Sequence, residues 1–429
     1  MKARLLYIIG ILCFFGFTLF LTFNKHSKAK SFTYQSEIWA DKAGYYAYLP
    51  AAFKFDFNSN KFPDSIDVKT GNGFTLDQKT GKVITKYTCG VALMQAPFFL
   101  IADIIAEPLG FDRDGFSKVY HSSINVASVF YLVLGFIFLF KFLSARFGNK
   151  TSFFTIFSLF FATNLYYYSI DETGMSHIYS FSLFCMFLYF IQSTNYLKKN
   201  GYLISLLFGL LTGLIILIRP TNMMFLSAFL FLDINEKRDV FDRFKRLINY
   251  KTLIPCLVGI LLVISPQLLY WNYLSGSFIR YSYANEGFNW LDPKLLHTWF
   301  SPNNGLFLYT PFYLLIVGSL FLMIKNKKVN GIFISILFLI MSYVFSSWWM
   351  WSFGCSFGSR SYVEYLSLFS IPIAYMFLGI LKMKPLKLIV LSIVILVFVA
   401  FNLKLIYAYD GCFYGGNAWS WSAYLELVE

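Results

Sequence analysis

Charged residues are scarce in this chain of 429 residues: they make up 14% of it, against roughly a quarter of an ordinary soluble domain. Hydrophobic residues make up 57%, and a soluble fold of this size could not bury so much apolar surface. The six cysteines form no CxxC pair and no cluster with histidines at metal-ligand spacing. The nucleotide-binding motifs GxGxxG and GxxxxGKS/T are missing. These absences exclude a soluble protein and leave no sequence signal for a zinc or nucleotide site.

The apolar residues gather into runs that suit membrane-crossing helices, which need about 20 apolar residues each. Aromatic residues reach 21%, as expected where Phe meets lipid and Tyr and Trp meet headgroups. Eleven runs of spanning length, or nearly so, occur at 5–23, 119–140, 151–170, 177–196, 202–218, 220–232, 252–271, 305–324, 330–347, 361–381 and 385–407. The sequence therefore predicts an all-α polytopic membrane protein with about 11 transmembrane helices, forming a single domain over residues 1–429.

The net charge of +14 comes largely from basic residues in the loops between these runs, so it does not point to nucleic acid. With a cytoplasmic N-terminus, the inside loops are 1–4, 141–150, 197–201, 233–251, 325–328 and 382–387. They hold nineteen Lys and Arg, whereas the short outside segments hold only Arg219, Arg280, Lys294 and Arg360. Since short loops obey the positive-inside rule, we expect the N-terminus inside and the C-terminus outside.

The largest extramembrane piece is the first outer loop, residues 24–118. Its twelve basic residues do not oppose this placement, because long loops are translocated largely regardless of charge. Within the loop, the apolar segment 91–106 contains Pro97 and Asp103. We interpret it as a helix that lies in the outer interface or dips into it.

No inside loop is long enough to form a catalytic domain; the longest is 233–251. An enzyme of this kind would have to act at the outer face, where soluble nucleotide-activated donors are normally absent.

The tail 408–429 is also expected outside. Cys89, Cys355 and Cys412 would then share the oxidising side, and pairing of Cys355 with Cys412 is one option.

Two carboxylates follow the first predicted helix. If residues 37–48 are helical, Glu37, Asp41 and Gly44 share one face, so the segment could rest on the membrane with a carboxylate pair turned inward. The alternative is a solvated amphipathic helix whose acids are simply exposed.

Two further groups of polar residues lie at the outer ends of predicted helices. Lys86 and Tyr87 precede the interfacial segment, where a lysine suits a lipid phosphate, although a snorkelling lysine is the alternative. Asp171, Glu172 and His177 lie in an outer loop without a basic residue. They could bind a sugar or a cation, or they could form a polar turn.

Two arginines complete the set of candidate residues. Arg219 has apolar helix on both sides, and an arginine so placed faces an internal cavity or a counter-ion, with phosphate as a natural partner. Arg360 follows the Gly- and Trp-rich loop 347–359, which is typical of a binding surface. Glu364 is one helical turn further on, so a structural Arg360–Glu364 salt bridge is the alternative.

The order of these features resembles the GT-C superfamily of membrane glycosyltransferases, which includes protein O-mannosyltransferases and lipid A aminoarabinose transferases. Asp41 stands where those enzymes have an acidic catalytic residue, near the start of a long outer loop. Lys86-Tyr87, before the Pro97 segment, is similar to their lysine-containing donor-phosphate element. Further segments look like those of bacterial members: 219–222, 301–307 and 357–360. The likeness covers most of the chain as an architecture, but only residues 37–99 carry active-site motifs.

The resemblance implies an inverting sugar transfer from a polyprenyl-phosphate donor to a hydroxyl of a lipid, glycan or protein, at the outer face of a bacterial cytoplasmic membrane. Asp41 would be the catalytic base. The residues expected to bind substrate are Glu37, Lys86, Tyr87, Asp171, Glu172, His177, Arg219, Arg360 and Glu364. Lys42 stands where the family has a second acid, which leaves the need for a divalent cation (Mg or Mn) open.

Two other classes of function remain. A transporter or flippase for a lipid-linked or anionic substrate would also suit eleven helices and an intramembrane arginine, but the sequence lacks the related halves common in transporters. A structural subunit would tolerate replacement of Asp41.

Overall fold

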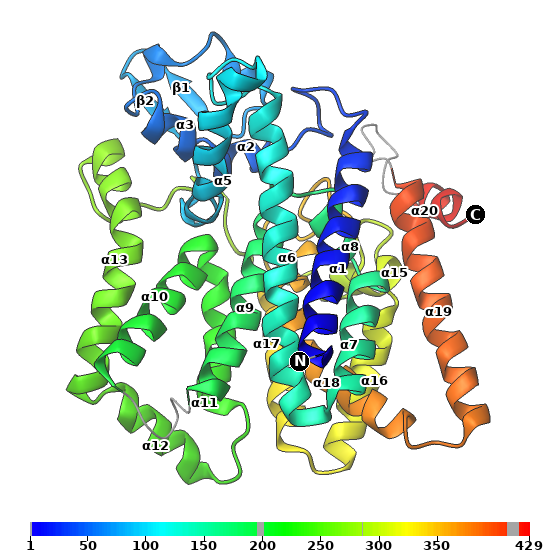
Figure 1. The fold of residues 1–429 in the computed structure, drawn as a ribbon. Helices are drawn as coiled ribbons and strands as arrows, with labels where there is room; N and C mark the ends of the chain where they lie inside the picture. The colour runs from blue at the N-terminus through cyan, green and yellow to red at the C-terminus, as the bar shows by residue number, and fades with distance from the viewer. Residues whose placement is uncertain (1, 195–200, 285, 410–419) are drawn as a thin grey trace.

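The computed structural model describes residues 2–194, 201–284, 286–409 and 420–429, and this part of the chain is mostly helical. Within it, six helices are long enough and apolar enough to cross a membrane. They are α1 (Lys2–His26), α5 (Gly90–Ala106, extended by the 3₁₀ turn η2, Glu107–Leu109), α6 (Lys118–Phe147), α13 (Tyr250–Ser275), α17 (Val329–Ser346) and α19 (Pro385–Ala408). The prediction of a helical, polytopic membrane protein is therefore confirmed (Figure 1).

The count of eleven spans stays a prediction. Five of the predicted spans fall on long helices, whereas the others fall on helices of at most 18 residues or on broken segments. At about 1.5 Å per residue, helices of 17 residues or fewer are shorter than the roughly 30 Å hydrocarbon core. The helix Ser176–Ser193 is as long as α17, 18 residues, but is not among the six candidate spans. These shorter elements are α7 (Asn149–Phe161), α8 (Leu165–Ile170), α9 (Ser176–Ser193), α10 (Tyr202–Ile218), η3 (Pro220–Ser227), α11 (Ala228–Phe231), α15 (Leu306–Tyr309), α16 (Phe312–Lys325), η4 (Arg360–Tyr362) and α18 (Leu366–Ile380).

The chain breaks at Arg219-Pro220, between the predicted apolar runs 202–218 and 220–232. α10 ends at Ile218, and Arg219 is extended, with φ −153° and ψ 124°, before the 3₁₀ helix η3. The ring of Pro220 disfavours the α conformation for the residue before it, which explains why the helix stops here. The break leaves Arg219 at the end of a helix instead of within one.

The first loop is residues 27–117 in the structure, since α1 ends at His26 and α6 begins at Lys118. Apart from α5 and η2, it contains α2 (Asp41–Tyr46), α3 (Tyr48–Phe53), η1 (Ser59–Lys61), α4 (Ile66–Lys69) and the antiparallel strands β1 (Thr75–Asp77) and β2 (Lys82–Ile84), with Leu76 opposite Val83. Buried aromatic residues such as Phe62, Phe74 and Phe116 give this loop its own apolar core, which also involves α5 and α6. It forms the top of the molecule in Figure 1.

α5 has the length and composition of a membrane span, whereas the sequence predicts an interfacial helix. It lies beside the end of α6 that carries the first loop (Figure 1). Its first residue, Gly90, touches the end of α10 so closely that a Cβ would stand 2.6 Å from the Ile218 nitrogen. Only glycine fits this approach, which joins the first loop to the break at Arg219.

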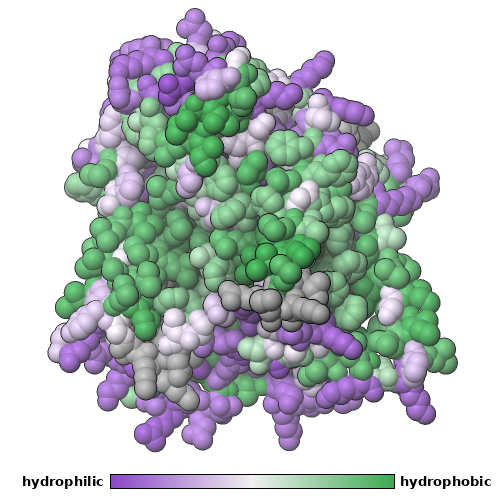
Figure 2. Space-filling view, in the orientation of Figure 1, coloured by the Kyte–Doolittle hydropathy of each residue, from purple (hydrophilic) through white to green (hydrophobic). Residues whose placement is uncertain are grey.

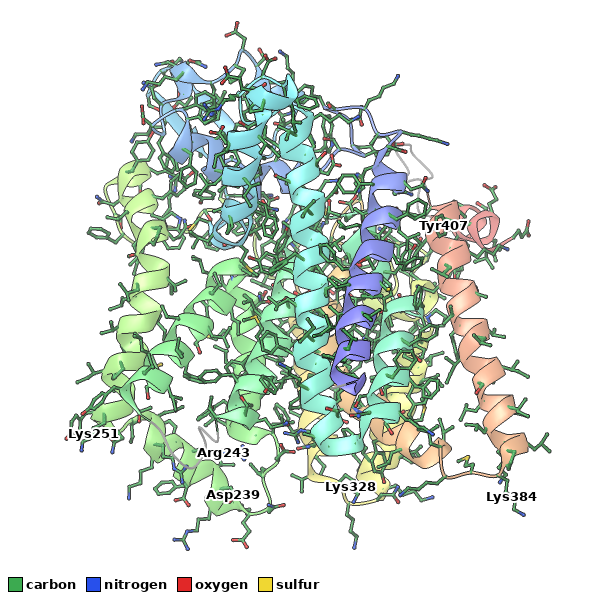
Figure 3. The ribbon with its side chains drawn as sticks, in the orientation of Figure 1. Asp239, Arg243, Lys251, Lys328, Lys384 and Tyr407 are labelled. Atoms are coloured by element: carbon green, nitrogen blue, oxygen red, sulfur yellow. The ribbon has the colours of Figure 1, made fainter. Side chains whose placement is uncertain are left out.

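The two ends of the molecule are polar, and a broad apolar belt lies between them on the face drawn in Figure 2. Figure 3 shows Arg243, Lys251, Lys328 and Lys384 together at the end opposite the first loop. These residues belong to the loops predicted to be cytoplasmic, among them the segment that holds α12 (Lys237–Leu247). Three of the predicted cytoplasmic loops thus share one end, while the side of the membrane on which they lie stays a prediction.

The C-terminal tail contains α20 (Trp421–Val428), whose Tyr424 packs against Tyr309. Cys412 lies outside the described residues, so its pairing with Cys355 stays a prediction. The remaining short helix, α14 (Leu295–Phe300), precedes α15.

Candidate functional site

A cavity of about 580 Å³ lies between the first loop and four other segments: residues 168–175, the turn after α10, the residues from Arg280 to Tyr283 with Glu286 and Phe288, and residues 345–360. We call it the main cavity. Its volume falls in the roughly 300–1,000 Å³ range of small-molecule sites. Six of the residues predicted to act at the site line it: Asp41, Lys86, Tyr87, Glu172, Arg219 and Arg360. The other four, Glu37, Asp171, His177 and Glu364, do not.

Close backbone packing fixes the position of Asp41, the first residue of α2. Ala40 before it has φ +46°, a conformation that L-residues rarely adopt. Its amide donates to the Thr70 carbonyl, and a Cβ on Gly73 would stand 1.8 Å from the Ala40 oxygen. Gly44 is equally confined, because a Cβ there would stand 2.3 Å from the Tyr87 ring. The glycines thus allow the first loop to fold tightly around Asp41.

The Asp41 carboxylate is held by two donors and still faces the cavity. The Tyr87 hydroxyl donates to Oδ1 at 2.5 Å, and the Arg360 guanidinium donates to Oδ2 at 2.9 Å. The side chain remains 35% exposed. Burial raises the pKa of this carboxyl, but the charge of Arg360, the Tyr87 hydrogen bond and the charge of Lys86 together bring the pKa below its usual value. Asp41 is therefore ionised at neutral pH.

Lys86 presents a cation to the same cavity. Its Nζ lies 2.6 Å from Glu286 Oε1 and 5.5–5.6 Å from the ring centres of Tyr87 and Tyr283. The Ser282 hydroxyl donates to the Lys86 carbonyl at 2.6 Å. Contacts from two distant parts of the chain therefore hold this lysine. An aromatic surround of this kind stabilises a cation without neutralising it.

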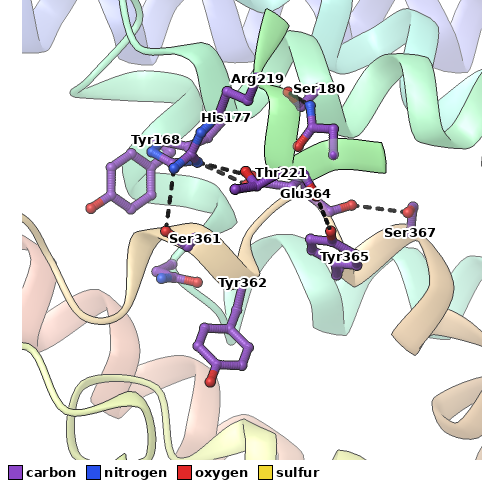
Figure 4. A network of polar contacts seen from close by, with 12 residues as sticks. Tyr168, His177, Ser180, Arg219, Thr221, Ser361, Tyr362, Glu364, Tyr365 and Ser367 are labelled. Atoms are coloured by element: carbon purple, nitrogen blue, oxygen red, sulfur yellow. Dashed lines mark hydrogen bonds and ion pairs between the residues drawn. The ribbon is translucent and has the colours of Figure 1, made fainter. Parts of the chain in front are cut away.

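Arg219 joins the main cavity to a buried polar network (Figure 4). Its Nη1 lies 3.0 Å from Glu364 Oε1, and His177 Nδ1 lies 3.0 Å from Glu364 Oε2. His177 and Glu364 are almost fully enclosed, whereas Arg219 is 18% exposed. Two predicted substrate-binding residues therefore lie behind Arg219, where they hold it in place.

The alternative Arg360–Glu364 salt bridge is wrong. Arg360 pairs with Asp41, and Glu364 pairs with Arg219. The prediction assumed helical spacing, but residues 360–362 form a 3₁₀ turn, and α18 begins only at Leu366. The preceding loop does contribute to a surface, since Trp348, Trp349 and Phe353 line the main cavity.

Glu37 lies in a separate buried cluster. Its Oε1 is 3.0 Å from His26 Nδ1 and accepts a hydrogen bond from Asn125 at 2.7 Å, and its Oε2 is 2.9 Å from His121 Nδ1. Burial raises the pKa of Glu37, but the two histidines hold it well below its usual range. The predicted carboxylate pair on one helical face is wrong, because α2 begins only at Asp41.

Asp171 and Glu172 form ion pairs with different segments of the chain. Asp171 lies 2.7 Å from Lys25 at the end of α1, and Glu172 lies 3.0 Å from Lys42, the residue after Asp41. Lys42, which stands where the resemblance leads one to expect an acid, therefore carries a buried positive charge beside Asp41.

The sequence prediction missed Lys42, Arg280, Tyr283 and Glu286, which also line the main cavity. A signal existed for Arg280, one of only four basic residues in the short outer segments. In the described residues it has no carboxylate within ion-pair distance. No sequence signal pointed to Glu286, because only the tertiary fold brings it to Lys86.

In the part of the chain that the structure describes, no group of three His, Cys, Asp or Glu side chains is arranged to hold a metal ion. No protein-family model matches the chain, and neither a curated protein nor a solved structure matches it.

Proposed function

We propose that this protein is an inverting glycosyltransferase that moves a sugar from a polyprenyl-phosphate donor to an acceptor hydroxyl at the outer face of a membrane. One observation carries the proposal: an ionised carboxylate, Asp41, faces a cavity that is also lined by Lys86, Arg219, Arg280 and Arg360. A base next to an excess of cations is what transfer from a phosphate leaving group requires.

The chemistry is a single displacement at the anomeric carbon. The acceptor oxygen forms a bond to that carbon while the bond from the carbon to the phosphate oxygen breaks, and the bonding electrons leave with the phosphate. Asp41 accepts the proton of the acceptor hydroxyl. The departing phosphate is stable as an anion, so it needs no general acid. Lys86 and Arg280 would stabilise its growing charge.

The surface around the main cavity suits a lipid-linked donor. Trp349 and Met350 line the cavity and are also exposed on the surface. Ile279 and Leu291, which lie on either side of the lining residues Arg280 and Phe288 in the sequence, are 82% and 102% exposed. An isoprenoid tail could lie along such apolar side chains while its phosphate reaches the cations. This arrangement gives a reason for such chemistry to belong to a membrane protein.

The test compares lipids and glycans by mass spectrometry in cells that lack the protein and in cells supplied with wild type or Asp41→Asn. We expect one sugar modification to disappear without the protein and to return with wild type alone, together with released polyprenyl phosphate. A flippase would move the lipid-linked sugar without cleaving it, so no polyprenyl phosphate would be released. Full restoration by Asp41→Asn would remove Asp41 from the role of base.

A further inference from the structure

A second, smaller cavity of about 240 Å³ lies beside the end of α1. It is below the roughly 300–1,000 Å³ that holds drug-sized ligands. Residues that line it include Lys25, Lys28, Ala29, Asp171 and Tyr167. We call it the small cavity.

The two cavities meet at a common wall, because Tyr34 and Glu172 line both of them. Glu172 forms an ion pair at 3.0 Å with Lys42, which lines the main cavity and directly follows Asp41. A group that enters the small cavity and passes Glu172 therefore approaches the site from a side other than that of Lys86.

The linings of the two cavities differ in charge. The main cavity has more cations than carboxylates, as an anionic ligand requires. In the small cavity Lys25 and Lys28 are balanced by Asp171 and Glu172, and Lys25 is already paired with Asp171 at 2.7 Å. His26, which also lines this cavity, has its own carboxylate partner in Glu37 at 3.0 Å. The ligand that fits the small cavity therefore needs no net charge.

The remaining lining identifies the kind of neutral ligand. Gln35 supplies an amide, and Tyr34, Tyr167 and Tyr409 supply phenol rings. Hydrogen-bonding groups next to aromatic faces suit a polyhydroxyl ring. Ala29 is the only aliphatic residue among the described lining, so the small cavity has no surface for a lipid tail.

We propose that the small cavity binds a neutral saccharide ring and that this ring is the reacting end of the acceptor. The second half of this statement rests on the proposed function, whereas the binding itself does not. The sequence already marked Asp171 and Glu172 as candidates for contact with a sugar; both line the small cavity, and Glu172 also lines the main cavity.

The test is saturation-transfer difference NMR on the full-length protein in lipid nanodiscs. The probes are the methyl glycosides of glucose, galactose and mannose, with cyclohexanol as a ring without the hydroxyl pattern. Ala29→Trp fills the small cavity, and Ser27→Trp adds the same side chain at a nearby exposed position outside both cavities. Lys28→Trp is a second filling variant, at an exposed residue that tolerates change.

We expect at least one glycoside, but not cyclohexanol, to receive saturation from wild type and Ser27→Trp, and to lose it in both filling variants. Absence of glycoside binding to wild type, or equal binding by the filled variants, overturns the proposal. Sugar transfer measured on the same samples separates the two hypotheses. Binding without any transfer leaves the saccharide site in place and removes the enzyme assignment, whereas undiminished transfer by Ala29→Trp removes the acceptor subsite alone.

Discussion

Asp41 and Glu37 are carboxylates four residues apart in the first loop, yet their surroundings are opposite. Asp41 is 35% exposed to the main cavity, whereas Glu37 is 8% exposed and enclosed by His26, His121 and Asn125. Protein donors engage both oxygens of each carboxylate, but only Asp41 is also open to a cavity, where a remaining lone pair can take a proton from a ligand. The comparison shows that two acids close in sequence can have different roles: the one that faces a cavity is available to a ligand, and the enclosed one supports the fold.

Replacing Asp41 by Asn should give the largest effect on activity. We expect the transfer rate to fall by roughly 10²–10⁴-fold, the usual contribution of a general base. The melting temperature should change little, because Asn is isosteric: its oxygen can accept from Arg360, and its amide can donate to the Tyr87 hydroxyl oxygen. The measurement is the initial rate of sugar transfer by purified protein in nanodiscs. A rate equal to that of wild type would show that Asp41, like Glu37, is not the catalytic base.

Replacing Glu37 by Gln should act on stability instead. We expect a loss of about 2–3 kcal/mol in the free energy of unfolding, because two histidines lose their buried carboxylate. The transfer rate per folded molecule should stay near that of wild type. Thermal unfolding in detergent measures the first effect, and Glu107→Gln, at an exposed position of the same loop, is the control. A folded variant without activity would show that Glu37 takes part in the chemistry.

Acid should reduce the stabilisation that Glu37 provides. The pKa of Glu37 lies below that of an unfolded glutamate, about 4.3, so its contribution is complete above that pH and is lost as the pH falls toward the folded value. The difference in melting temperature between wild type and Glu37→Gln should therefore narrow between pH 5 and pH 3. A difference that widens over this interval contradicts the assignment.

Lys86→Ala should have a smaller effect, confined to the donor. We expect the KM for the lipid donor to rise about tenfold, the loss of one charge-assisted hydrogen bond, while the KM for the acceptor stays nearly constant. Lys79→Ala, at an exposed lysine of the same loop, controls for the lost charge. Equal changes in both KM values would show that Lys86 supports the fold of the site instead of the donor phosphate.

Much of the architecture could be predicted from the sequence, because long apolar runs and charge asymmetry are local signals. The same signals pointed to Asp41, Lys86, Tyr87, Arg219 and Arg360, which stand at helix ends or in the first loop and reach one cavity. Polar groups are costly near lipid, so those that are present tend to serve a site.

What could not be predicted depends on tertiary contacts. The positive φ of Ala40, which delays the start of α2 to Asp41, has no sequence signal and separates Asp41 from Glu37. Glu286 reaches Lys86 across 200 positions of the chain, and His121 reaches Glu37 across 84. Helical spacing suggested the wrong partner for Arg360, because that residue lies in a 3₁₀ turn before α18 begins.

The central claim is that the main cavity binds a lipid-linked phosphate beside Asp41. Native mass spectrometry of the purified chain with added polyprenyl phosphate tests it most directly. We predict one bound lipid per wild-type chain, its loss in the Lys86→Ala/Arg280→Ala double variant and its retention in Lys69→Ala/Lys79→Ala, which removes two exposed charges from the first loop. Equal lipid binding by all three proteins would contradict the claim.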